Sequence, residues 1–226
     1  MANSRWMRLP SRWIDDHGLT QLSWSYAGGG SDNTAALMAL TVIAHEIESE
    51  TGVARITYDR MCDLTGLSRA KLANGLNILK KIGVINSESQ ETRSTYALSH
   101  YDEGAWAKFP VKSMYSSGRI VAFDEFRLRR VVELDALKLF FLFVARRDQR
   151  TNLANIGYEK IEEYSGVKRF RIKSAISFLA SLSLVYVEHA PSLSNAYGIS
   201  NAYRIVGIDP RMNMATRGRN VDLFAG

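Results

Sequence analysis

Four cations lie close together in the segment SGVKRFRIKSAI, which covers residues 165–176: Lys168, Arg169, Arg171 and Lys173. Apolar residues follow them at helical spacing, so the segment predicts an amphipathic helix that begins with positive charge. A helix N-terminus is itself partly positive, and a like charge there costs roughly 0.3–1 kcal/mol. Phosphate groups bind well at such a position, because the helix dipole and the side chains attract them together. We therefore expect an anionic partner outside the chain.

Other residue types that perform chemistry are not spaced for catalysis or for metal binding. The paired carboxylates Asp15–Asp16 and Glu162–Glu163 are adjacent in sequence, so they diverge on a helix, and no nucleophile, base and orienting group occur together. The glycine-rich segment AGGGSD lacks the Lys-Ser/Thr of a phosphate-binding loop. The four histidines have no neighbours at ligand spacing: His17, His45, His100 and His189. We expect no enzyme activity, no cofactor and no metal.

The charge of the chain is unevenly distributed. The 226 residues carry a net charge of +6, and the pI is about 9.5. Residues 1–103 hold 10 Lys and Arg against 12 Asp and Glu, a net of −2, and residues 104–226 have a net of +8. A basic protein favours nucleic acid as its partner first and an anionic membrane surface second. The second half is therefore the better candidate for binding an anion.

Cysteine usage and hydropathy suggest a cytoplasmic protein. Cys62 is the one cysteine, which allows no internal disulfide and suits a reducing compartment. The first residues, MANSRWMRLPSRW, lack the apolar centre of a signal peptide. The longest apolar run, LFFLFVA at 139–145, is too short to cross a bilayer and indicates a buried helix. We expect no membrane partner.

The sequence repeats itself with a shift of 100 residues. RITYDRMCDLTGLSRAKLANGLNILKKIGVI, at 55–85, aligns without a gap with NIGYEKIEEYSGVKRFRIKSAISFLASLSLV, at 155–185. The same register matches WMRLP at 6–10 with WAKFP at 106–110, and AALMALTVIAHE with DALKLFFLFVAR. A register kept across three separate blocks indicates a duplicated module. We expect one domain at 1–103, a second at 104–208, and a C-terminal tail at 209–226.

Each module is expected to be mainly helical and to end in a small β-hairpin. An extended segment leads to a loop, which is glycine-rich in the first module (YAGGGSDN) and basic in the second (FRLRRVVE). Hydrophobic spacing then predicts the following elements, one in each module: an apolar helix at 35–48 and 135–147, a strand at 54–56 and 154–156, a helix at 57–64 and 157–164, a longer helix at 68–82 and 168–182, and a hairpin.

The longer helix separates apolar from polar residues. Leu72, Leu76 and Leu79 recur at helical spacing and should face the core. Ser68 is placed to cap the helix N-terminus, and Gly66 suits a positive φ in the preceding turn. The polar residues should face outward in both modules: Arg69, Lys71 and Asn74 in the first, and Arg169, Arg171 and Ser174 in the second.

This order of elements resembles the winged helix-turn-helix family, and LTGLSRAKLANGLNILKKIGVI and YSGVKRFRIKSAISFLASLSLV resemble its second and third helices and first wing strand. Two such modules in one chain resemble plasmid and phage replication initiators. The resemblance implies sequence-specific binding of double-stranded DNA through recognition helices that begin near 68 and 168. The implied DNA contacts are Ser68, Arg69, Lys71, Asn74, Lys168, Arg169, Arg171, Lys173 and Ser174, with Arg93, His189 and Asn195 on the wings.

Several points stay open at this stage. Many family members have a basic residue five places after the cap-like position; Lys173 fits this pattern and Ala73 departs from it. A transcriptional regulator would share the same DNA contacts. Tandem winged helices also serve as protein-interaction adaptors, as in chromosome-condensing complexes. The tail adds Arg211, Arg217 and Arg219, and its NVDLF resembles the peptide that docks on the sliding clamp, although Asn220 replaces the usual glutamine.

Overall fold

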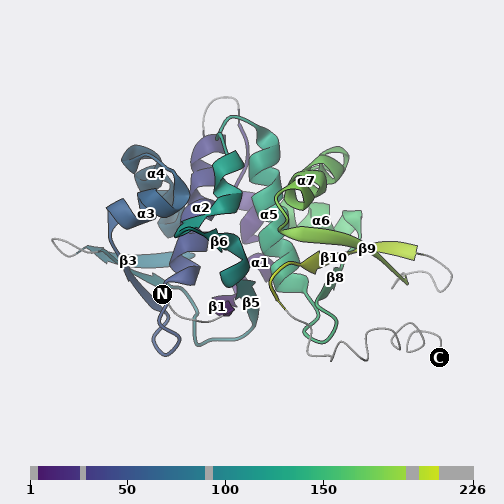
Figure 1. Ribbon diagram of the computed structural model, residues 1–226, viewed down its shortest axis with the longest axis horizontal. Helices are drawn as coiled ribbons and strands as arrows, with labels where there is room; N and C mark the ends of the chain where they lie inside the picture. The colour runs from purple at the N-terminus through teal and green to yellow at the C-terminus, as the bar shows by residue number, and fades with distance from the viewer. Residues whose placement is uncertain (1–4, 26–28, 90–93, 192–198, 209–226) are drawn as a thin grey trace.

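Two copies of one order of elements, displaced by about 100 residues, make up the molecule (Figure 1). The computed structural model describes residues 5–25, 29–89, 94–191 and 199–208. The first copy contains β1 (Trp6–Pro10), α1 (Arg12–Asp15), η1 (Gly18–Gln21), α2 (Gly30–His45), β2 (Val53–Ile56), α3 (Tyr58–Thr65), α4 (Arg69–Lys81), β3 (Ile85–Ser89) and β4 (Ser94–Leu98).

The second copy repeats this order with small additions between its first strand and its long apolar helix. It contains β5 (Trp106–Pro110), η2 (Lys112–Met114), β6 (Tyr115–Ser116), β7 (Arg119–Ile120), η3 (Val121–Glu125), α5 (Val131–Arg146), β8 (Leu153–Asn155), α6 (Tyr158–Ser165), α7 (Arg169–Ser181), β9 (Val185–Pro191) and β10 (Ile199–Ile205). Helices and small antiparallel sheets together therefore confirm the expected fold class at this level.

Each copy carries a three-stranded antiparallel sheet. The strand orders are β2-β4-β3 and β8-β10-β9, so the strand before the helix pair lies beside the second strand of the hairpin. The register pairs Ala54 with Tyr96 in the first copy and Ala154 with Tyr203 in the second. In both copies these residues are buried, which attaches the hairpin to the helical core.

Local sequence explains how the two helices before each hairpin are joined. Gly66 and Gly166 end α3 and α6 at φ values of 71° and 68°, a conformation that glycine adopts without strain. Ser68 then caps α4 by accepting a hydrogen bond at 3.3 Å from the backbone N–H of Lys71. Lys168 occupies the corresponding position before α7 and supplies no side-chain cap.

The copies are related by an approximate two-fold axis. β1 and β5 pair antiparallel with Arg8 opposite Lys108, and these two residues are equivalent in the repeat. The rings of Trp6 and Trp106 stack across this pair at 5.9 Å. Figure 1 shows α2 and α5 side by side at the centre, with α4 and α7 on their outer sides and the hairpins pointing away from each other.

The segment after β1 packs on the second copy. The indole of Trp13 meets Phe141 of α5 edge-on at 6.1 Å, and the ring of His17 stacks on Tyr164 of α6 at 4.7 Å. The buried ammonium of Lys138 donates a hydrogen bond at 2.6 Å to the carbonyl of Leu22. Burial lowers the pKa of Lys138 to about 8, although nearby Asp135 opposes that shift.

The segment after β5 packs on the first copy in the same way. His45, at the end of α2, lies between the carbonyl of Pro110 at 2.8 Å from Nε2 and the Tyr115 hydroxyl at 3.1 Å from Nδ1. Burial lowers the pKa of His45 to about 3, so its ring is neutral. Nε2 therefore donates to the carbonyl and Nδ1 accepts from the hydroxyl. Each copy thus completes the core of the other, and their buried side chains form one continuous cluster.

Within the described residues, no helix combines the length and apolar character needed to cross a membrane.

Candidate nucleic-acid interface

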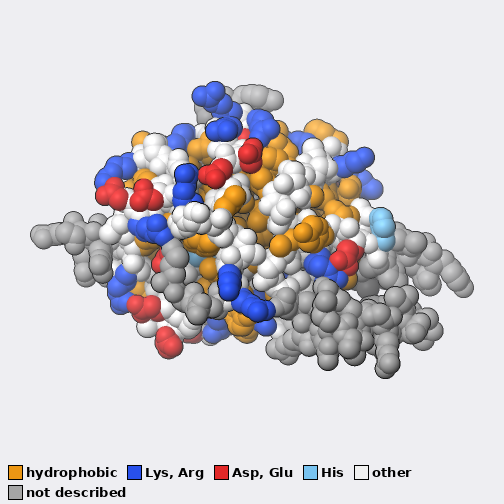
Figure 2. Space-filling model, in the orientation of Figure 1, with side chains coloured by type: hydrophobic (Ala, Val, Ile, Leu, Met, Phe, Trp, Pro, Cys, Tyr) orange, Lys and Arg blue, Asp and Glu red, His pale blue; other side chains and the backbone are white. Residues whose placement is uncertain are grey.

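The third helix of each copy contacts the long apolar helix of the same copy through a cation in its first residues. Lys71 of α4 binds the first turn of α2, with Nζ at 2.7 Å from Asp32 Oδ1 and 2.6 Å from Ser31 Oγ. Arg171 of α7 binds the second turn of α5, with Nε at 3.0 Å from Asp135 Oδ2. Figure 2 shows Lys and Arg side chains at the top of the view, at the edge of the molecule where α2 and α5 begin.

The outer side of α7 offers cations to solvent. Arg169 and Lys173 are exposed, and neither forms an ion pair or a hydrogen bond with the part of the chain that the structure describes. Phe170 lies between them in sequence and is 83% exposed, although a phenyl ring normally prefers burial. This side of α7 can therefore make ionic, hydrogen-bonding and apolar contacts with a partner.

The helical pattern predicted that Arg171 faces solvent, but in the structure it does not. Its side chain is only 29% exposed and pairs with Asp135, whose side chain is 3% exposed. Burial raises the pKa of Asp135, and the charges of Arg171 and Lys138 partly oppose that rise. The expectation of an outward orientation is wrong because residue 171 lies on the side of α7 that packs against α5.

The polar side chains of α4 are engaged within the first copy. Arg69 forms an exposed ion pair with Asp59 of α3. Lys71 and Asn74 share Asp32, and Asn74 Nδ2 donates to its Oδ2 at 3.3 Å. Three residues of α4 were predicted to face outward, and two of them, Lys71 and Asn74, instead bind Asp32. Asp32 lies shortly before residue 35, where the sequence predicted the start of the apolar helix, and that position was its only sequence signal.

The remaining candidate residues have mainly local roles. Ser68 is the cap described above, and Ser174 donates a hydrogen bond to the carbonyl of Arg171 at 2.8 Å. Lys168 lies 3.5 Å from Glu162 in an ion pair that is largely exposed. His189 is exposed on β9, opposite Asn201 of β10.

Three groups of predicted contacts fall outside the described residues. They are Arg93 and Asn195 on the hairpins, and the tail at 209–226 with its arginines and its clamp-like peptide. Their contacts therefore remain predictions.

A basic loop of the second copy, which lies beside the first copy, was not predicted as a site. This arginine loop, residues 127–130, has the sequence RLRR and directly precedes α5. The fully buried carboxylate of Glu133 accepts from the backbone N–H groups of Arg127 and Arg129, each at 3.2 Å, and from Nε of Arg130 at 3.0 Å. A Glu three residues after a helix cap position was the sequence signal for this arrangement.

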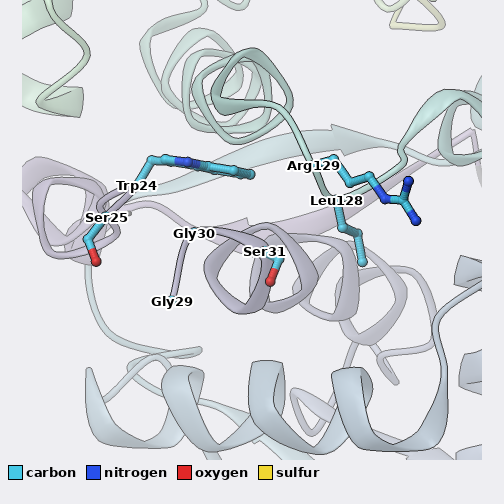
Figure 3. Close-up of a pocket in the computed structure, with 7 residues that line it drawn as sticks. All are labelled: Trp24, Ser25, Gly29, Gly30, Ser31, Leu128 and Arg129. Atoms are coloured by element: carbon cyan, nitrogen blue, oxygen red, sulfur yellow. The ribbon is translucent and has the colours of Figure 1, made fainter. Parts of the chain in front are cut away.

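The arginine loop lies beside the start of α2. An open pocket of about 310 Å³ separates them and is lined by Trp24, Ser25, Gly29, Gly30, Ser31, Leu128 and Arg129. In Figure 3 the guanidinium of Arg129 points away from the Trp24 indole on the opposite side of the pocket. The pocket has few polar side chains converging on it, so the exposed arginines are the stronger candidates for function.

The described residues provide little for metal or thiol chemistry. No group of three or more His, Cys, Asp or Glu side chains gathers there at metal-binding distance. Burial raises the pKa of the partly buried Cys62 thiol, which disfavours the nucleophilic thiolate. Comparison of the sequence with protein-family models gives no match, and comparison with curated proteins gives none either.

Proposed function

We propose that the chain is a tandem winged-helix protein that binds double-stranded DNA sequence-specifically and without catalysis, as a replication initiator of a plasmid, phage or other mobile element. The main support is the outer side of α7, where Arg169 and Lys173 are exposed and have no partner among the described residues. The strand orders β2-β4-β3 and β8-β10-β9 suit a winged helix, because each hairpin follows its third helix as a wing would.

The side chains on α7 match the chemistry of a major groove. A guanidinium such as that of Arg169 can donate two hydrogen bonds to the O6 and N7 atoms of guanine. The ammonium of Lys173 suits a phosphate, and the ring of Phe170 suits the methyl group of thymine. We therefore assign base reading to the first turn of α7.

The two copies should contribute unequally to binding. The cations of α4 form ion pairs with Asp59 and Asp32, so DNA would have to compete with those carboxylates. The cations of α7 at 169 and 173 need no such exchange. We therefore propose that α7 provides most of the specificity and that α4 contacts a neighbouring groove more weakly.

Binding to duplex DNA across a range of salt concentrations tests the proposal. Arg169→Ala should weaken binding to a selected site by about 1–3 kcal/mol and relax specificity at one or two base pairs. Arg150→Ala is the matched control, because Arg150 is also exposed but follows the opposite end of α5. No binding of the wild-type chain to a random duplex pool at 50 mM salt would refute the proposal.

Two other functions would show themselves in the same work. A transcriptional regulator would make the same DNA contacts, so a selected site that maps to a promoter instead of an array of direct repeats would favour it. A protein-interaction adaptor is favoured by the exposed apolar side chains of Phe170, Tyr186 and Val187 in the second copy. It would bind duplex DNA weakly or not at all.

A further inference from the structure

We infer that the arginine loop, residues 127–130, is a third DNA contact, which binds the phosphate backbone between the grooves that α7 and α4 occupy. The inference rests on the proposed DNA-binding function. It adds a contact that no recognition helix or wing provides.

The arginine loop belongs to the second copy and also lies beside the first. The guanidinium of Arg130 lies 5.3 Å from the ring centre of Phe178, which belongs to α7. Leu128 and Arg129 line the pocket that the loop shares with the first residues of α2. That same turn of α2 binds Lys71 of α4. The loop therefore lies beside the C-terminal part of α7 and beside the turn of α2 that contacts α4, at the end of the molecule where α2 and α5 begin (Figure 1).

The loop is held in place with its charge exposed. Glu133 binds two backbone N–H groups and the guanidinium of Arg130, so its single negative charge is used inside the loop. Arg127 and Arg129 are exposed and have no ion pair or hydrogen-bonding side-chain partner among the residues that the structure describes. A loop that is already ordered loses little conformational entropy when it binds.

Phosphate is the chemistry that fits this loop best. Guanidinium groups bind phosphate with paired hydrogen bonds, and two of them are presented here on a loop instead of on a helix that could enter a groove. The equivalent segment of the first copy, AGGG at 27–30, carries no cation, so this concentration of positive charge belongs to the second copy alone.

Salt titration of a double variant tests this contact. Each phosphate contact contributes about 0.9 to the slope of log K against log salt. The double variant Arg127→Ala with Arg129→Ala should therefore reduce the steepness of this slope by about 1.8. If the variant and the wild type bind equally at 1 M salt, the variant should bind about 30-fold more weakly than the wild type at 0.15 M salt. The loss should be the same for every duplex sequence, because phosphates carry no sequence information.

Two further variants make the result specific. Lys112→Ala with Arg150→Ala removes the same charge near Pro110 and beyond α5, at the other end of the central helices, and should leave the slope unchanged. Replacement of both loop arginines by lysine should retain the salt slope, because the charge is kept, but should lower the affinity, because an ammonium group cannot form the paired hydrogen bonds of a guanidinium.

The possible outcomes separate the loop contact from the proposed function. Unchanged slope in the double alanine variant, with normal binding by the wild-type chain, overturns the loop contact alone. A loss restricted to particular base pairs also overturns it, because the loop would then read bases. If the wild-type chain binds no duplex DNA, both the proposed function and the loop contact are overturned.

Discussion

Replacing Arg171 with alanine should destabilise the fold, whereas Arg169→Ala should weaken DNA binding and leave the fold intact. Both residues are arginines, two positions apart on α7, but their surroundings differ. Arg171 pairs with the buried Asp135, and Arg169 is exposed with no ionic partner in the described part of the chain. This contrast separates a structural arginine from a reading arginine on one helix.

The magnitude follows from the geometry of the ion pair. Unit charges about 4 Å apart attract by roughly 4 kcal/mol at an effective dielectric constant of about 20. Removing one partner of a fully buried pair costs about 3–5 kcal/mol. Arg171 is 29% exposed, so water can reach the space that it leaves, and Lys138 still faces the carboxylate of Asp135. We therefore expect Arg171→Ala to lower the free energy of unfolding by about 1–3 kcal/mol.

The loss should depend on pH. Burial raises the pKa of Asp135 in the folded protein, so protonation of this group favours the folded state. The stability that it contributes is present below its unfolded pKa of about 3.9 and is lost as pH rises through the folded pKa. Without Arg171 the pKa of Asp135 rises further, so the destabilisation should be smaller at pH 4 than at pH 7.

Urea unfolding at the two pH values measures both effects. Asp135→Ala and the double alanine variant complete a double-mutant cycle, which isolates the coupling between the two side chains. We expect a coupling of about 1–3 kcal/mol at pH 7, and Arg169→Ala should change stability by less than about 0.5 kcal/mol. If Arg171→Ala unfolds at the wild-type urea concentration at pH 7, the pair is not structural and the reasoning is refuted.

Three further predictions concern packing and recognition. Gly75→Ala should lower the free energy of unfolding by about 1–3 kcal/mol, because the added Cβ would lie 2.7 Å from the backbone nitrogen of Ala36. This loss should exceed the gain from the better helix propensity of alanine, and the denaturant midpoint measures the net effect. Residues 1–103 and 104–208 expressed separately should lack protected amides in hydrogen exchange and should regain them when mixed, and independent folding of either would contradict the exchanged packing. Phe170→Ala should weaken a selected site as much as replacing one thymine with uracil, and the two losses should not add if the ring contacts that methyl group.

Sequence reasoning located the elements of the fold closely. The third helices, expected at 68–82 and 168–182, are Arg69–Lys81 and Arg169–Ser181. This worked because helix spacing, a serine cap and a glycine with positive φ are local features. The apolar helix was expected to begin at 35 and begins at Gly30, since glycine and asparagine gave no local signal for helix there.

The candidate site was predicted only in part, because its polar contacts join residues that are distant in sequence. Lys71 and Asp32 are 39 residues apart, and the hydrogen bond from Lys138 to Leu22 spans 116. A helical pattern shows which side of a helix is polar, but it does not show which polar residue meets a partner. That choice depends on how α4 and α7 lie against α2 and α5.

The duplication, the order of elements and the excess of positive charge in the second half can all be predicted from the amino-acid sequence, because repeats, hydrophobic spacing and composition are properties of the chain. Only the tertiary structure shows that each copy packs against the segment after the other copy's first strand, and that Arg171 is paired while Arg169 is exposed. It also places the arginine loop beside α7 and the first turn of α2, where the buried carboxylate of Glu133 holds it. These features arise from packing between distant segments, which local preferences do not specify.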